Sequence, residues 1–211
     1  MEISWYGHSC FRITERGMAT VVTDPYDHAA AGYSALKLKA DIVTVSHDAP
    51  GHSFLKGVKG NDWTLDGPGE YEIGGVFITG VATSGNKDQP PNMVFVMDYD
   101  SVTVAHLGDL RDVPSRAQVE ALGTVNVALI PVGGGNGLNA AKAAEVIAMI
   151  EPGIVVPMHF KTKDSKPKLS SANRFLQEMG LPTTEKPQDS LKVTATSVPS
   201  ETRVVVLEVR S

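Results

Sequence analysis

A short apolar run that ends in two histidines constrains this chain more than any other stretch. Residues 42–45 predict a buried strand, and His47 and His52 follow it in a turn that contains Pro50 and Gly51. A rigid strand fixes the loop that follows it, so functional groups are often built at such strand ends. Because neutral imidazole is a common metal ligand, this stretch predicts a metal or catalytic site.

The rest of the chain alternates short strands with a few helices. Apolar runs around Gly7 predict a hairpin over residues 3–13, and Gly74-Gly75 predicts another over residues 71–81. Further strands are predicted over residues 19–24, 93–97, 102–109, 125–131, 153–159, 191–194 and 203–209. Helices are predicted over residues 114–122, 140–150 and 170–180, with Asn139 as the N-cap of the second.

Two polar loops each have two interpretations. The glycine-rich loop 132–137 either offers backbone N–H groups to an anion or uses glycine only for left-handed backbone conformations. Residues 161–168 include four lysines and one aspartate, and they form either a solvated loop or a phosphate contact. Neither loop has the spacing of a P-loop, so no nucleotide site is predicted.

Five short motifs are spread over most of the chain. In chain order they are Trp5-Tyr-Gly-His8, Asp24-Pro25, the pair His47 and His52, His106-Leu-Gly-Asp109, and Pro157-Met-His159. Together they resemble the metallo-β-lactamase superfamily, in particular its small lactonase-like branch. The resemblance covers nearly the whole chain and implies an α/β (α+β) fold, a four-layer αββα sandwich, in a single domain over residues 1–211.

Three positions depart from the pattern of that superfamily. Its first motif reads His-x-His-x-Asp-His, and here Ala49 and Gly51 stand at the second histidine and the aspartate. A further histidine is expected near Gly85 and Asn86 and is absent. Restoring the first motif, with Ala49→His and Gly51→Asp, is therefore expected to raise metal occupancy.

The motif residues that remain imply a reduced metal site. His52, Asp109 and His159 are the implied ligands of at most one divalent cation, Zn or alternatively Mn, because three protein ligands plus water make an open catalytic site. His47 is implied as a fourth ligand or as the group that orients the bound water. Asp109 and His47 are thus the implied catalytic residues, and a site that binds no metal is the alternative.

Three neighbouring residues are less well defined. His8 is either part of this site or a hydrogen-bonded core histidine. Asp24 either lies close to the metal, as the resemblance implies, or only forms the turn before Pro25. His106 is implied to support the site rather than to bind metal.

The resemblance implies a metal-dependent hydrolase of a small ester, lactone or phosphoester. The alternative is a non-catalytic relative that keeps the fold and the cleft, either to bind a small anion or to serve as a scaffold. The missing ligands support this alternative, because their loss weakens metal affinity more than a change behind the ligands would.

Composition argues against several partners. The net charge of −5 and the lack of a long basic run predict no nucleic-acid binding. No apolar stretch approaches the length of a membrane span, and the N-terminus has no secretory pattern. With the single Cys10, these features predict a cytoplasmic protein that acts on a small molecule. Formation of a homo-oligomer stays open.

Overall fold

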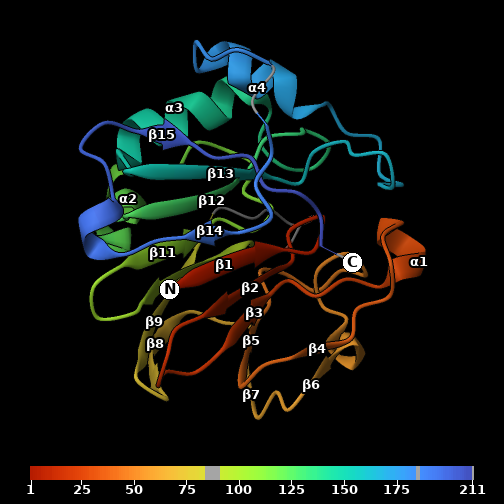
Figure 1. The fold of residues 1–211 in the computed structure, drawn as a ribbon, viewed down its shortest axis with the longest axis vertical. Helices are drawn as coiled ribbons and strands as arrows, with labels where there is room; N and C mark the ends of the chain where they lie inside the picture. The colour runs from red at the N-terminus through yellow and green to blue at the C-terminus, as the bar shows by residue number, and fades with distance from the viewer. Residues whose placement is uncertain (84–90, 184–185, 211) are drawn as a thin grey trace.

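The computed structural model describes residues 1–83, 91–183 and 186–210 (Figure 1). The loop in which a histidine was expected, at Gly85 and Asn86, lies outside these residues. Within them the chain forms two large β-sheets and one small one. The longest described helix has 11 residues, and no helix in the described ranges could span a lipid bilayer.

The first large sheet has six strands in the order β14–β1–β2–β3–β5–β7. They are β1 (Glu2–Trp5), β2 (Phe11–Thr14), β3 (Val21–Thr23), β5 (Ile42–Thr44), β7 (Trp63–Leu65) and β14 (Leu191–Lys192). β1 and β2 form the predicted hairpin, in which Ser4 lies opposite Arg12. β3 and β5 are parallel, with Val22 opposite Val43, so both strands end at the same edge of the sheet.

The second large sheet has seven strands in the order β15–β13–β12–β11–β10–β9–β8. They are β8 (Gly69–Ile73), β9 (Val76–Ala82), β10 (Met93–Asp98), β11 (Thr103–His106), β12 (Val127–Pro131), β13 (Ile154–Met158) and β15 (Arg203–Val204). Gly74 and Gly75 form the predicted turn, with φ of 56° and 81°. β11, β12 and β13 are parallel, so their carboxyl ends also share one edge.

Side chains from both sheets belong to one continuous apolar core. Trp5 and Phe11 of the first sheet join Phe95 and Met97 of the second, and all four are at most 1% exposed. Every residue of β12 and of β13 is buried. Strands covered on both faces read as continuous apolar runs, which is why the sequence predicted them.

Helices cover the seven-stranded sheet. α3 (Ala140–Ile150) and α4 (Ala172–Glu178) lie on its outer face (Figure 1), and α2 (Arg116–Leu122) packs near β9. Asn139 caps α3 as predicted, accepting a hydrogen bond from the Lys142 N–H at 3.0 Å. α2 begins two residues later than Pro114, because Ser115 forms a capping box with Gln118.

The layer outside the six-stranded sheet is thin. A second apolar cluster buries Val22 and Val43 beneath Tyr26, Tyr33 and Val58. The elements in this layer are α1 (His28–Ala31), η1 (Leu55–Gly57), β4 (Leu38–Lys39) and β6 (Val58–Lys59). The remaining short helix, η2 (Ala195–Ser197), comes late in the chain, between β14 and β15. The predicted α/β sandwich is confirmed, and among the described residues this fourth layer consists of short helical turns, the two-stranded sheet of β4 and β6, and loops.

The two sheets meet at the edge where β3 and β5 end. The Met93 N–H, at the start of β10, donates to the carbonyl of Ser46, which follows β5, at 2.8 Å. The His159 N–H, after β13, donates to the carbonyl of His8 at 3.1 Å. Residues that follow strands of different sheets are therefore brought together at this edge.

Gly108→Ala tests how tightly this edge is packed. Gly108 has a φ of 59°, and an added Cβ would collide with Ser46 and Asn92. We expect the free energy of unfolding, measured in urea, to fall by more than about 2 kcal/mol, from backbone strain plus steric overlap. Gly180→Ala is the control, because Gly180 has a φ of 69° but nothing within 4 Å of an added Cβ. Equal losses in the two variants would contradict the steric argument.

Candidate metal centre

His8 lies in the turn between β1 and β2, with a left-handed φ of 51°. Gly7 precedes it with a φ of 98°, and a Cβ there would lie 2.7 Å from the ring of Tyr33. The His8 carbonyl accepts hydrogen bonds from the indole of Trp5 at 3.0 Å and from the His159 N–H at 3.1 Å. These contacts fix the buried His8 imidazole at the strand-end edge.

His106 supports the same turn from the second sheet. Its Nε2 lies 2.9 Å from the carbonyl oxygen of Ser9, and the Thr23 hydroxyl donates to that same oxygen at 3.0 Å. Because a carbonyl can only accept, Nε2 of His106 carries a proton. His106 therefore positions the turn that carries His8, the supporting role that the resemblance implied.

Asp24 is the centre of a buried hydrogen-bond network. Its carboxylate accepts from the Ser46 N–H at 2.7 Å, from the Ser46 hydroxyl at 2.6 Å and from Nδ1 of His52 at 2.8 Å. The side chain of Asp24 is fully buried. Asp24 is therefore more than a turn former, because it orients a histidine of the site.

The same network fixes the tautomer of His47. Nδ1 of His47 lies 3.0 Å from the Ser46 hydroxyl, which already donates its only proton to Asp24. The hydroxyl must then accept from His47, so Nδ1 of His47 carries the proton and the lone pair of Nε2 stays free. In His52, Nδ1 is likewise engaged by Asp24, and Nε2 remains for another ligand.

Asp109 follows β11, and the side chain of Asn92 holds its backbone in place. Its N–H donates to Oδ1 of Asn92 at 2.7 Å, and Nδ2 of Asn92 donates to the carbonyl of Leu107 at 3.0 Å. A Cβ on Gly137 would lie 2.6 Å from Oδ1 of Asp109, so the carboxylate lies against the glycine-rich loop. The buried Asn92 thus sets the direction of the turn that presents Asp109.

His159 follows β13 with a left-handed φ of 50°. Its Nδ1 lies 2.6 Å from Oδ1 of Asp109, and both side chains are buried. The two atoms are not aligned as a hydrogen bond, and neither has another hydrogen-bond partner among the described residues. Both polar atoms are thus close together while their hydrogen-bonding capacity is unused.

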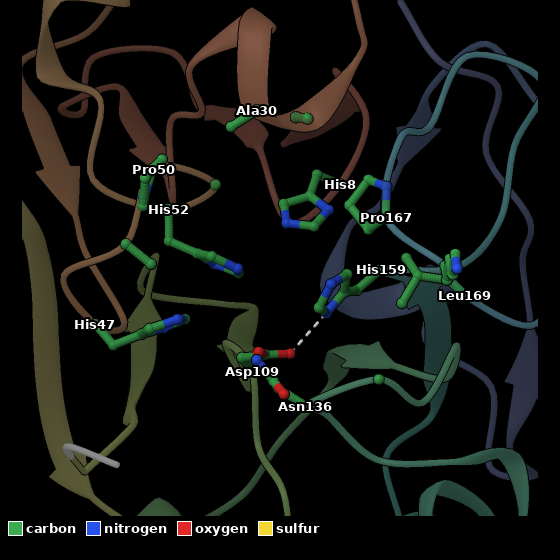
Figure 2. A pocket seen from close by; sticks show the side chains of 15 residues that line it. His8, Ala30, His47, Pro50, His52, Asp109, Asn136, His159, Pro167 and Leu169 are labelled. Carbon is green, nitrogen blue, oxygen red and sulfur yellow. Dashed lines mark ion pairs between the residues drawn. The ribbon is translucent and has the colours of Figure 1, made fainter. Parts of the chain in front are cut away.

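The five side chains converge on one cavity of about 360 Å³ (Figure 2). The imidazoles of His8, His52 and His159 surround it from three sides, and His47 and Asp109 lie below them in this view. Two groups of mutually close ligand atoms result, with all separations within 4.8 Å. The first is His8, His52 and His159, and the second is His47, His52 and Asp109.

Burial keeps two of these imidazoles neutral. It lowers the pKa of His8 well below its usual value, and the neighbouring His159, His52 and His47 lower it further. Burial also lowers the pKa of His47 to about 4, aided by the nearby His52. A neutral imidazole keeps the lone pair that a metal ion needs.

The carboxylates have the opposite balance. Burial acts to raise the pKa of Asp109, but the close His159 and the neighbouring His52 and His47 outweigh it and lower the pKa to about 2. Burial opposes the ionisation of Asp24 too, yet His52, His106 and the hydrogen bonds lower its pKa. Conversely, burial acts to lower the pKa of His52, and Asp24 raises it on balance. Both carboxylates are therefore ionised at neutral pH.

The residues of this cavity fit a divalent metal ion. Buried polar atoms nearly always have a partner, yet among the described residues Nδ1 of His8 has no hydrogen-bond partner, and Nδ1 of His159 and Oδ1 of Asp109 have only their unaligned contact with each other. A zinc–nitrogen bond of about 2.1 Å places two ligand nitrogens at most about 4.2 Å apart. Small ring rotations would therefore bring the 4.8 Å group of His8, His52 and His159 into range.

The three predicted ligands, His52, Asp109 and His159, all line this cavity. His52 belongs to both groups of close ligand atoms, one with His8 and His159 and one with His47 and Asp109. His47 lies at the cavity, as expected. Nδ1 of His52 is engaged by Asp24, so Nε2 is the atom of His52 that remains for either group.

His8 was not among the predicted ligands, and the structure places its imidazole at the same cavity. A Cβ on Gly51 would lie only 2.8 Å from Nε2 of His8, so the imidazole occupies the space next to the missing aspartate. The expectation that Ala49→His combined with Gly51→Asp raises metal occupancy stays a prediction, and in this structure an aspartate at position 51 would have to displace the His8 imidazole. The signal in the sequence was the motif Trp5-Tyr-Gly-His8 in a predicted turn, which left His8 either in the site or in the core.

Comparisons with known proteins agree with this architecture. The chain matches the family described as Beta-lactamase superfamily domain over residues 2–159. A UPF0173 protein of Pyrococcus furiosus is 30% identical over 188 residues, which cover 77% of this chain and 84% of that protein. A UPF0173 metal-dependent hydrolase of Natranaerobius thermophilus is 22% identical over the same shares.

Solved structures extend the match to the whole chain. A proposed Zn-dependent hydrolase of the metallo-β-lactamase superfamily from Thermotoga maritima has 37% identity and a TM-score of 0.81, covering 99% of both chains. Igni18, a metallo hydrolase of Ignicoccus hospitalis, has 19% identity and a TM-score of 0.65 over 97% of this chain and 94% of that one, which shows the fold alone. The chain therefore belongs to the metallo-β-lactamase superfamily.

Proposed function

We propose that this protein is a metal-dependent hydrolase of a small ester, lactone or phosphoester, and that His8, His52 and His159 hold one divalent cation. One observation carries the proposal: three buried imidazoles from distant parts of the chain line one cavity together with His47 and Asp109. The Natranaerobius relative and the Thermotoga structure, named as hydrolases, support the same class of reaction.

Zinc is the simplest ion for this site. Three imidazoles with an open position are typical ligands of catalytic zinc. When bound, such an ion lowers the pKa of a water molecule and polarises a carbonyl or phosphoryl oxygen. The site holds at most one ion on this proposal, because His52 belongs to both groups of ligand atoms.

His47 and Asp109 have the properties of catalytic residues. His47 is neutral, and its Nε2 is free to accept a hydrogen bond from an attacking water. Asp109 is ionised and supplies a second acceptor at the same cavity. Together these two acceptors orient the lone pair of the water toward the substrate.

Metal content measured beside a panel of hydrolysis reactions tests the proposal. We expect at most one zinc or manganese ion per chain in protein purified without chelator, and turnover of at least one ester, lactone or phosphoester. Two tightly held ions would contradict the single site. Metal binding without any turnover would favour the alternative, a non-catalytic relative that binds a small anion.

His47→Asn separates catalysis from metal binding. We expect kcat to fall by about 10²–10⁴-fold, the range for loss of a positioned acid or base, while metal content stays unchanged because the three other histidines remain. His28→Asn is the matched control, since the side chain of His28 is 58% exposed on α1. Loss of metal in the His47 variant would instead make His47 a ligand.

Gly51→Asp tests whether His8 has taken the place of the motif carboxylate. We expect metal affinity to fall by about tenfold or more, as when the geometry of ligands is disturbed, because the new Cβ would lie 2.8 Å from Nε2 of His8. His8→Gly combined with Gly51→Asp should recover part of that affinity. Tighter metal binding by the single Gly51 variant, measured against a chelating dye, would refute the argument.

Asp24→Asn tests the support of His52. The amide keeps the shape of the side chain but loses the charge, so we expect metal affinity to fall by about 10–100-fold. Asp48→Asn is the control, because Asp48 is exposed and accepts its hydrogen bond from Ser53. Circular dichroism checks that both variants fold. Equal affinity in the two variants would show that Asp24 has no role in the site.

A further inference from the structure

A second groove opens beside the metal cavity. It has a volume of about 450 Å³ and lies between the glycine-rich loop before α3 and the lysine-bearing segment after β13. The lining residues are Gly133, Gly134, Gly135, Lys161, Ser165, Lys166, Pro167, Lys168, Leu169 and Ser170. Two loops that the sequence left ambiguous therefore form the two walls of one groove.

The groove is continuous with the metal cavity. Gly135, Pro167, Lys168 and Leu169 line both of them. Figure 2 shows Pro167 and Leu169 at the side of the cavity that His159 borders. A molecule bound over the metal ligands could therefore extend one end into the groove.

Backbone hydrogen bonds hold the two walls together. The Ser170 N–H donates to the carbonyl of Gly133 at 2.8 Å, and the Lys161 N–H donates to the carbonyl of Ser170 at 2.9 Å. The Lys166 N–H donates to the carbonyl of Ala31 in α1 at 3.0 Å. The lysine-bearing segment is thus fastened at both ends and in its middle, which gives the groove a defined shape.

The charges on the lining all have one sign. Of the residues that the structure describes, three lysines and no carboxylate line the groove, although the chain as a whole carries −5. The ammonium of Lys166 donates to the carbonyl of Ala29 at 2.7 Å. Among the described residues, the side chains of Lys161 and Lys168 have no hydrogen bond or ion pair, so these two cations are available to a ligand.

The opposite wall of the groove, the glycine-rich loop, lets a ligand come close to backbone N–H groups. Gly134 and Gly135 have φ of 72° and 71°, and a Cβ on Gly135 would lie 3.1 Å from Leu169. The N–H groups of Gly135 and Asn136 donate to no acceptor among the described residues, whereas that of Gly134 donates to Leu138. Backbone N–H groups opposite lysines are a common way to bind phosphate.

We propose that this groove binds a phosphate group of the substrate, one remote from the bond that is hydrolysed. The substrate is then a phosphorylated small molecule, with its ester or lactone over the metal centre and its phosphate between Lys161, Lys168 and the glycine-rich loop. This substrate class rests on the proposed hydrolase function. Binding of phosphate in the groove does not depend on the hydrolase function, because none of the proposed metal ligands lines the groove.

Inorganic phosphate tests the groove without turnover. The His159→Ala variant is treated with chelator, so that no bound metal can compete for phosphate. Its affinity for phosphate is then measured by calorimetry. We expect Lys161→Ala and Lys168→Ala to weaken binding by about five- to tenfold each in this background, the range for loss of one charge-assisted contact. Lys163→Ala is the control, since Lys163 lines a different cavity beside Trp5 and Tyr33.

Either of two results would overturn the proposal that the groove binds phosphate. One is an equal loss of phosphate affinity in the Lys163 variant, and the other is unchanged phosphate affinity in the variants of Lys161 and Lys168. Acetate at equal concentration should bind more weakly than phosphate, and equal binding would mean that the groove selects charge alone rather than phosphate.

Kinetics on wild-type, metal-loaded protein then assign the phosphate to the substrate. Two acetyl esters that differ only by one phosphate on the alcohol are compared. We expect the phosphorylated ester to have the lower KM, and Lys168→Ala to raise that KM about five- to tenfold with little change in kcat. Equal KM values for the two esters would overturn the substrate class. A protein that binds phosphate in the groove but hydrolyses neither ester, and no member of the panel of esters, lactones and phosphoesters, would refute the hydrolase function while the anion site stands.

Discussion

The buried carboxylate of Asp24 is the interaction on which this site depends. A charge without solvent is costly unless it is paired and hydrogen-bonded. Here Ser46 donates twice, and Nδ1 of His52 donates once. The same contacts tie the end of β3 to the end of β5 and set the rings of His47 and His52. One buried anion thus joins strand packing to the geometry of the cavity.

The site also contains much of the unusual backbone of the chain. His8, Asp24 and His159 have positive φ values of 51°, 39° and 50°. For residues other than glycine such conformations cost about 1–3 kcal/mol each, and they persist only where the surroundings enforce them. The two large sheets and the hydrogen bonds to the His8 carbonyl provide that enforcement. Strain at these positions is consistent with a site that holds its side chains ready for a ligand.

The loss of the motif carboxylate at position 51 has a spatial counterpart. Gly51 leaves room for the imidazole of His8, which completes a group of three buried histidines. Residues outside the first motif therefore also bring side chains to the cavity. The groove of Lys161 and Lys168 is a similar case, because two loops that are weak signals separately form one cationic wall and one glycine wall when they meet.

The sequence by itself determined the strands, the turn at Gly74-Gly75, the N-cap at Asn139 and the superfamily, because apolar periodicity, glycine conformation and capping act over a few residues. It also placed His47 and Asp109 at strand ends. Only the tertiary structure decided that His8 joins His52 and His159, that Asn92 aims the turn of Asp109, and that Asp24 orients two rings. These contacts join residues far apart in the chain, and no local pattern records which strand ends meet across two packed sheets.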